Sequence, residues 1–120
     1  MASARSFTRQ HRLLQSREYQ RVFKHTQCKS SDQYFTVLAC RNQLDHPRLG
    51  LAITKKKLRT AVARHKLKRI IRESFRHQKE LLMGLDIVVL GQSKAATVSN
   101  LELLNSLHNH WLNLVKRCKS

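Results

Sequence analysis

The sequence concentrates its cationic side chains in one segment. Ten Lys and Arg residues lie between positions 55 and 76, and Glu73 is the single acidic residue among them. The planar fork of an Arg side chain can hold a phosphate through two parallel hydrogen bonds, and Lys adds a mobile positive charge. Because so few carboxylates are near enough to form surface ion pairs, this segment is predicted to bind the phosphates of a nucleic acid.

The spacing of these residues separates them from the apolar ones. No Gly or Pro interrupts residues 59–80, which predicts a long helix. At about 100° per residue, one side carries the residues that can pack on a sheet: Ala63, Leu67, Ile70, Ile71 and Ser74. The basic side chains fan over another side, with Arg64 at the boundary: His65, Lys68, Arg69, Arg72 and Arg76. One helix can therefore join the core and still present cations to phosphates.

The charge of the whole chain agrees with this interpretation. Its 120 residues contain 24 Lys and Arg against 7 Asp and Glu, a net charge of +17. Such an excess repels itself unless an anion neutralises it, and the release of counterions from phosphates favours nucleic acid as that anion. The length fits a single domain over residues 1–120. Residues 1–12 are expected to form a flexible basic arm that carries Arg9 and has Phe7 as its one large apolar residue.

The other reactive residue types are scattered. The seven Asp and Glu residues form no close pair that could hold a catalytic metal or share acid–base work. Cys28, Cys40 and Cys118 have neither the spacing of a zinc site nor that of a disulfide scaffold, which predicts structural thiols. His108 and His110 fall on different sides of a helix. We therefore expect no catalytic residue and no metal site, and, without an apolar span or signal segment, a cytoplasmic location.

Shorter patterns predict a first helix and two strands. Ser16 is expected to cap a helix that ends near His25. Residues 34–39 are rich in β-forming side chains, and a turn over residues 42–47 follows them. Residues 48–54 alternate in polarity as a half-buried strand does, with three apolar residues on the buried side: Leu49, Leu51 and Ile53.

The C-terminal third adds a strand and a helix. Gly84 ends the turn after the long helix, and the apolar run over residues 85–90 predicts a central strand. Ser99 and Glu102 have the spacing of a capping box that opens the last helix. The apolar stripe of that helix is assigned to the core: Leu104, Leu107, Trp111, Leu114 and Val115. The order helix, strands, helix, strand, helix predicts a two-layer α+β domain.

One long motif makes the prediction specific. The sequence reads Arg48-Leu-Gly-Leu-Ala-Ile-Thr-Lys-Lys-Lys57, then Ala61-Val62, then Arg64-His-Lys-Leu-Lys-Arg-Ile-Ile-Arg-Glu73. This pattern resembles the signature of bacterial ribonuclease P proteins. The likeness extends to Glu18-Tyr-Gln-Arg-Val-Phe23, to the apolar strand at residues 86–90 and to the last helix, so it covers nearly the whole chain.

The resemblance implies a particular version of the α+β fold. Three helices would pack with a four-stranded sheet, in the ribosomal-protein-S5-domain-2-like arrangement. The strand that the patterns above do not supply would be short and lie near residues 26–31. The long basic helix would make a left-handed crossover, whereas ordinary crossovers are right-handed. The chain departs from the family at one motif, because the family usually has Arg-Asn-Arg where this sequence has Arg64, His65 and Lys66.

The resemblance also implies a function. The protein would be a subunit of an endoribonuclease in which a large RNA, with the Mg²⁺ ions it requires, carries out the catalysis. The protein itself would bind no cofactor. It would bind this catalytic RNA and the single-stranded 5′ leader of precursor tRNA, and so promote removal of the leader to give the mature tRNA 5′ end.

Two groups of residues are expected to make these contacts. Those that would bind the catalytic RNA are Arg9, Lys55, Lys56, Lys57, Arg59, Arg64, His65, Lys66, Lys68, Arg69 and Arg72. Those that would bind the leader are Tyr19, Phe23, Phe35, Val37 and Ala52. Small or polar side chains opposite the buried side of residues 48–54 leave room for a ligand, and the resemblance selects Phe35 and Val37 to share that side. Tyr19 and Phe23 could stack on bases, or they could simply pack the first helix on the sheet.

Other classes of protein share parts of this pattern. A ribosomal or other structural RNA-binding protein, or an architectural DNA-binding protein, would match the composition and the basic helix. The long motif favours the ribonuclease P protein over both. An independent nuclease would need a cluster of acid–base groups, and a membrane-surface helix would need more Trp and Leu on its apolar face.

Overall fold

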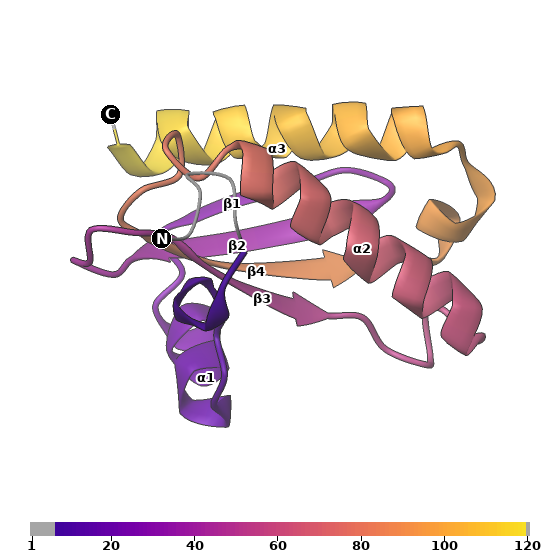
Figure 1. The fold of residues 1–120 in the computed structure, drawn as a ribbon, viewed down its shortest axis with the longest axis horizontal. Helices are drawn as coiled ribbons and strands as arrows, with labels where there is room; N and C mark the ends of the chain where they lie inside the picture. Colours follow the sequence, from indigo (N-terminus) through magenta and orange to yellow (C-terminus); the bar gives the residue numbers. More distant parts are fainter. Residues whose placement is uncertain (1–6, 120) are drawn as a thin grey trace.

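The computed structural model describes residues 7–119. Three α-helices and four strands follow one another in the predicted order (Figure 1): α1 (Ser16–Lys24), β1 (Cys28–Ser31), β2 (Phe35–Arg41), β3 (Arg48–Ala52), α2 (Ala61–His77), β4 (Leu85–Gly91) and α3 (Asn100–Lys119). Short 3₁₀ turns occupy Arg9–His11 and Ser93–Thr97. None of the described helices is long and apolar enough to cross a membrane.

The four strands form one mixed sheet in the order β1-β2-β4-β3. Strand β2 is antiparallel to both β1 and β4, and β3 is parallel to β4. Strand β1 lies where the resemblance placed a short fourth strand. The apolar run of β4 occupies an interior position of the sheet, as predicted, and its residues from Ile87 to Val89 are buried; Asp86 is the one buried charge in the strand. The α+β fold class is confirmed.

Helix α2 connects the two parallel strands. In Figure 1, β3 and β4 run from left to right with β4 above β3, and α2 runs back from right to left on the side nearer to the viewer. This connection is therefore left-handed, as the resemblance implied. The Thr60 hydroxyl accepts a hydrogen bond from the Ala63 backbone N–H at 3.1 Å and caps the helix. The helix consequently begins two residues later than predicted, and it ends at His77.

Helices α2 and α3 cover one face of the sheet and enclose the main core. Trp111 of α3 is fully buried, and its indole N–H donates to the Ser74 hydroxyl of α2 at 2.8 Å, so the one polar atom of the ring has a partner. The predicted stripe on α3 is wrong at Leu104, which is 37% exposed, whereas Leu103 is buried. The helix phase is set by the packing of Leu107, Trp111 and Leu114, and it turns position 103 inward.

Residues 7–13 of the N-terminal segment pack against the rest of the fold. The Leu13 backbone N–H donates to the Leu49 carbonyl at 3.0 Å, and Arg12 forms a parallel bridge with Leu49, so the segment lies along the free edge of β3. His11 and Leu13 are buried there. Residues 7–12 of the expected basic arm thus have backbone partners at the edge of β3; residues 1–6 lie outside the described part of the chain.

The start of α1 also differs from the prediction. Ser16 is the first residue of the helix and does not cap it; the N-cap is Gln15. The Glu18 carboxylate accepts hydrogen bonds from the backbone N–H groups of Leu14 and Gln15, at 2.7 and 2.9 Å. An ionised carboxylate satisfies free N–H groups at a helix start better than a hydroxyl does. At α3 the predicted cap is present, since the Ser99 hydroxyl accepts from the Glu102 N–H at 3.2 Å.

Two of the three cysteines are paired. Cys28 of β1 and Cys118 of α3 form a disulfide with a Cα–Cα distance of 5.7 Å, across 90 residues of sequence. The prediction that all three are structural thiols is therefore wrong for this pair and confirmed for Cys40, which is free and buried. Sequence spacing cannot reveal such a contact, because it depends on the packing of α3 beside β1.

Reduction should destabilise the protein. Because the disulfide closes a loop of 90 residues, reduction or Cys118→Ser should lower the free energy of unfolding by about 2 to 4 kcal/mol. Urea unfolding with and without a reductant measures this difference, after mass spectrometry has established the oxidised state. The Cys118→Ser variant is the control and should not respond to the reductant. Equal stability of the oxidised and reduced wild type would contradict the expectation.

Candidate nucleic-acid interface

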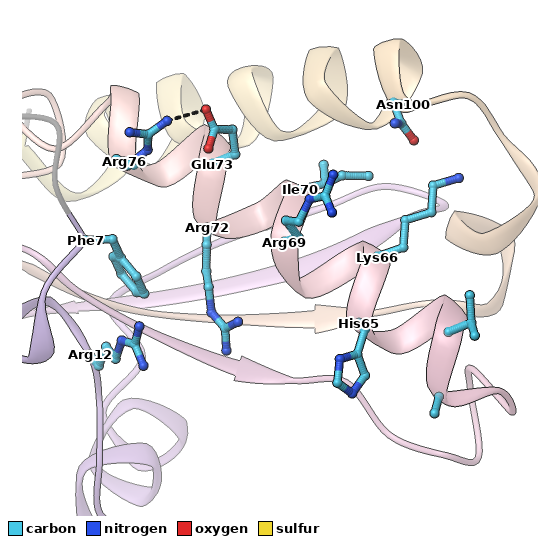
Figure 2. Close-up of a pocket in the computed structure, with 12 residues that line it drawn as sticks. Phe7, Arg12, His65, Lys66, Arg69, Ile70, Arg72, Glu73, Arg76 and Asn100 are labelled. Carbon is cyan, nitrogen blue, oxygen red and sulfur yellow. Dashed lines mark hydrogen bonds and ion pairs between the residues drawn. The ribbon is translucent and has the colours of Figure 1, made fainter.

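A broad hollow separates the outer side of α2 from the N-terminal segment (Figure 2). We call it the α2 hollow. Residues from α2 and Asn100 line one part, and Phe7 and Arg12 of the N-terminal segment line the other: Phe7, Arg12, Ala61, Val62, His65, Lys66, Arg69, Ile70, Arg72, Glu73, Arg76 and Asn100. The structure thus gathers His65, Lys66, Arg69 and Arg72 around one concave surface, whereas Lys68 of the predicted basic face does not line it.

The α2 hollow is strongly positive. Its single carboxylate, Glu73, is paired with Arg76, the contact drawn in Figure 2, and with His77 at 3.1 Å. The hydrogen bond from Arg76, followed by the one from His77, lowers the pKa of Glu73. Lys66, Arg69 and Arg72 form no ion pair with the described residues 7–119. Their charges are therefore available to an external anion such as a phosphate.

Phe7 and Arg12 belong to this surface but were absent from the predicted site. The Arg12 guanidinium lies 4.9 Å from the centre of the Phe7 ring, and that ring packs edge-on against Phe75 with 5.6 Å between centroids. Figure 2 shows both residues on the side of the hollow toward which Arg72 extends. The sequence signal was Phe7 itself, since a lone aromatic residue in a basic segment can anchor that segment to a core.

The other predicted cations occupy different positions. Arg64 is half-buried and donates to the carbonyls of Leu58 and Arg59 at 2.8 and 3.0 Å, so its guanidinium holds the loop before α2 together. Lys68 is half-buried on the flank of α2. Four are exposed in the loop between β3 and α2: Lys55, Lys56, Lys57 and Arg59. Arg9 is exposed on the N-terminal 3₁₀ turn and does not line the α2 hollow.

The opposite face of the sheet is covered at one end by α1. Tyr19 is half-buried against β3, where a side chain on Gly50 would approach the Tyr19 ring to 2.5 Å. The Tyr19 hydroxyl accepts a hydrogen bond from the Leu51 N–H at 3.2 Å. Phe23, one turn further along α1, is 45% exposed. Tyr19 therefore packs the helix on the sheet, whereas Phe23 presents a ring that a base could reach.

Two predicted leader-binding residues lie on the wrong face. Phe35 and Val37 are completely buried in the main core, on the side of the sheet that α2 and α3 cover. Ala52 lies on the α1 side, where it packs near Leu38 and Leu90. Alternation along a strand allows either assignment, and the core of β2 selected the other one. On that strand, Thr36 and Leu38 face the α1 side and are half-buried.

A buried carboxylate attaches α1 to the sheet. Asp86, at the start of β4, is fully buried and accepts hydrogen bonds from Arg48 at 2.7 and 2.8 Å, from Arg21 of α1 at 3.1 Å and from Asn42 at 2.9 Å. Arg48 also donates to Glu18 of α1 at 2.7 Å. The hydrogen bond to Asp86, aided by the nearby negative charges, raises the pKa of Arg48.

Glu18 remains a carboxylate in this cluster. Partial burial raises its pKa, but the N–H groups of Gln15 and Leu14 and the charge of Arg48 outweigh that effect, so the net shift is downward. Among residues 7–119, no group of three or more His, Cys, Asp and Glu side chains could hold a metal ion. The cluster is a set of ion pairs and hydrogen bonds that fixes α1 on the sheet.

The fold and its cationic surfaces define a nucleic-acid-binding protein of the α+β class, and comparison with known proteins identifies the family. The family model described as Ribonuclease P matches residues 7–115. The chain belongs to the ribonuclease P protein family, which confirms the resemblance carried by the motif between Arg48 and Glu73.

Individual relatives are similar to this chain over most of their own length. The ribonuclease P protein component of Methylococcus capsulatus is 46% identical over 112 residues, which are 93% of this chain and 87% of that protein. The component from Pseudomonas aeruginosa is 43% identical over 113 residues, or 94% of this chain and 84% of that protein. The structure of the Staphylococcus aureus RNase P protein is 34% identical, with a TM-score of 0.80, and the match covers 89% of this chain and 96% of that one.

Loss of the buried carboxylate should destabilise the fold. Asp86→Ala leaves Arg48, Arg21 and Asn42 without their common acceptor, and breaking such a buried pair costs about 3 to 5 kcal/mol. Urea unfolding of the variant measures the loss. As a control, Asp45→Ala removes a fully solvated carboxylate from the nearby turn and should change stability by less than about 1 kcal/mol. Equal losses of unfolding free energy in the two variants would show that the Asp86 cluster stabilises the fold no more than a solvated carboxylate does.

Proposed function

We propose that this protein acts in the cytoplasm as the protein subunit of a bacterial ribonuclease P. In this proposal a catalytic RNA and its Mg²⁺ ions cleave precursor tRNA, and the protein binds both the RNA and the 5′ leader. The observation that carries the proposal is the gathering of Lys66, Arg69 and Arg72 around one hollow on a member of this family. Their free charges can neutralise phosphates of a folded RNA.

The α2 hollow is the surface we assign to the catalytic RNA. It is concave, and cations from several turns of α2 and from Arg12 surround it. Phosphates of a structured RNA can be contacted from more than one direction there, which favours a folded backbone over a single extended strand. The exposed lysines at positions 55–57 extend the positive surface beyond the start of α2, where free backbone N–H groups also attract phosphate.

The α1 side of the sheet is the surface we assign to the leader. Phe23 presents an open ring, and the half-buried side chains on the α1 side of the sheet are small or apolar: Thr36, Leu38, Ala52 and Leu90. Aromatic and apolar surfaces bind unpaired bases by stacking and accept any base, as a leader of variable sequence requires. Tyr19 contributes by holding α1 on Gly50.

The first test concerns the α2 hollow. Arg69→Ala with Arg72→Ala should weaken binding to the catalytic RNA and reduce the slope of log K against log salt by about 0.7 to 0.9 for each lost phosphate contact. The matched control removes two exposed cations elsewhere, Lys29→Ala with Lys94→Ala. Filter binding over a salt series gives both slopes. If the two double variants behave alike, general charge rather than this hollow determines the affinity.

The second test concerns the histidine that replaces the usual amide of the family. His65 is exposed in the α2 hollow, where a neutral ring can donate one hydrogen bond and a protonated ring adds a charge. His65→Asn should bind the catalytic RNA as wild type does at about pH 8 and should lack the extra affinity of wild type near pH 6. The same pH profile for both proteins would exclude protonation of His65 from binding.

The third test concerns the leader. Phe23→Ala should weaken the complex with precursor tRNA by about 1 to 3 kcal/mol and leave the complex with mature tRNA unchanged. Because Phe23 is 45% exposed, the melting temperature should stay close to that of wild type. The Phe35→Ala variant provides the contrast, since truncating a fully buried ring should destabilise the protein by about 3 to 5 kcal/mol. Equal weakening of both tRNA complexes by Phe23→Ala would argue against leader binding at this ring.

A further inference from the structure

A second hollow lies between the N-terminal segment, the start of α1 and the turn that joins β2 to β3. We call it the turn hollow. Each of the three segments supplies part of its lining: Arg9 and Arg12, then Leu14 and Glu18, then Leu44 and His46. Arg12 also lines the α2 hollow, so the two hollows meet at this side chain.

The turn hollow is positively charged, because its nearby carboxylates are already paired. Glu18 is neutralised by Arg48 at 2.7 Å and by two backbone N–H groups. The other nearby carboxylate, Asp45, is paired with His46 at 2.9 Å. Arg9 and Arg12 form no ion pair with any residue of the described part of the chain. An anion that enters the hollow therefore finds two guanidinium groups without a competing carboxylate.

The turn hollow also has two apolar walls. Leu14 is 49% exposed and Leu44 is 40% exposed, although both are large apolar side chains. Their backbones are held in place: the Leu14 N–H donates to Glu18 at 2.7 Å, and the Leu44 N–H donates to the Asn42 side-chain oxygen at 2.8 Å. Asn42 is itself bonded to the buried Asp86. Two exposed apolar side chains on held backbone, beside two cations without an ion pair, match the flat, apolar base and the charged phosphate of a nucleotide.

We propose that the turn hollow binds one unpaired nucleotide of RNA, with the base between Leu14 and Leu44 and the adjoining phosphates on Arg9 and Arg12. The strand then continues across Arg12 into the α2 hollow. This inference rests on the proposed function, because it extends the RNA surface of a ribonuclease P protein past the N-terminal segment. The nucleotide can come from the catalytic RNA or from the precursor, and the chemistry of recognition is the same for both.

Single exposed residues allow a test that does not disturb the fold. Leu44→Ser should weaken RNA binding about threefold or more through lost apolar contact, and Arg9→Gln should lower the salt slope by about 0.7. Leu112→Ser and Lys94→Gln are the matched controls, since Leu112 of α3 is 44% exposed, Lys94 is exposed, and neither residue lines the two hollows. Binding to the catalytic RNA alone and binding of precursor tRNA to the assembled complex are measured separately. The arm in which the loss occurs identifies the source of the nucleotide.

A photo-crosslinking amino acid in place of Leu44 gives a second readout, with the same group in place of Leu112 as control. We expect a crosslink from position 44 to an unpaired nucleotide of one RNA and none from position 112. If wild type binds both RNAs while Leu44→Ser and Arg9→Gln bind as wild type does and position 44 gives no crosslink, the turn hollow is not a nucleotide site. If wild type binds neither RNA, the proposed function itself fails and the inference fails with it.

Discussion

The arrangement of the RNA surfaces depends on one buried carboxylate. Asp86 has no solvent exposure, and its oxygens are shared among Arg48 of β3, Arg21 of α1 and Asn42 of the β2–β3 turn. A buried charge is tolerable only when such partners surround it. The requirement to satisfy Asp86 therefore fixes three separate segments relative to β4, and among them is the only α-helix in residues 7–119 that packs on this face of the sheet.

This constraint separates two kinds of surface. On one face, α2 and α3 pack on the main core, and the outer side of α2 carries the cations. On the other, α1 covers one end of the sheet and leaves Phe23 accessible. The N-terminal segment runs along the edge of β3 and so borders both faces of the sheet. Its Arg12 lines both the α2 hollow and the turn hollow. Under the proposed function, the leader on the α1 side of the sheet and the catalytic RNA in the α2 hollow contact separate sets of side chains.

The sequence was most informative where local patterns agree with the packing. The order of elements, the basic face of α2, the interior strand β4 and the short strand β1 were all predicted, partly from periodicity and partly from the motif. Predictions failed where the outcome depended on distant parts of the chain. Either alternation of β2 was possible until the core selected Phe35 and Val37, and the pairing of Cys28 with Cys118 follows from the contact of α3 with β1.

The docking of the N-terminal segment was not predictable for the same reason. Its charge suggested a flexible arm, but the free edge of β3 gives it backbone partners and Phe7 gives it an anchor. This docking places Arg12 and Phe7 at the α2 hollow. The cluster at Asp86 could not be predicted from the sequence either. Arg48 lies 38 residues from Asp86 along the chain, and Arg21 lies 65 residues from it.

The central claim is that the Asp86 cluster sets α1 over the leader surface while the α2 hollow binds the catalytic RNA independently. Arg21→Ala tests it most directly, because Arg21 ties α1 to Asp86 and to the Arg41 carbonyl and lies outside both hollows. The measurement is the ratio of precursor to mature tRNA affinity for the complex assembled with this variant. We predict a ratio that falls toward one with unchanged affinity for the catalytic RNA. An unchanged ratio of precursor to mature tRNA affinity would contradict this claim, and so would an equal loss of affinity for precursor tRNA and for the catalytic RNA.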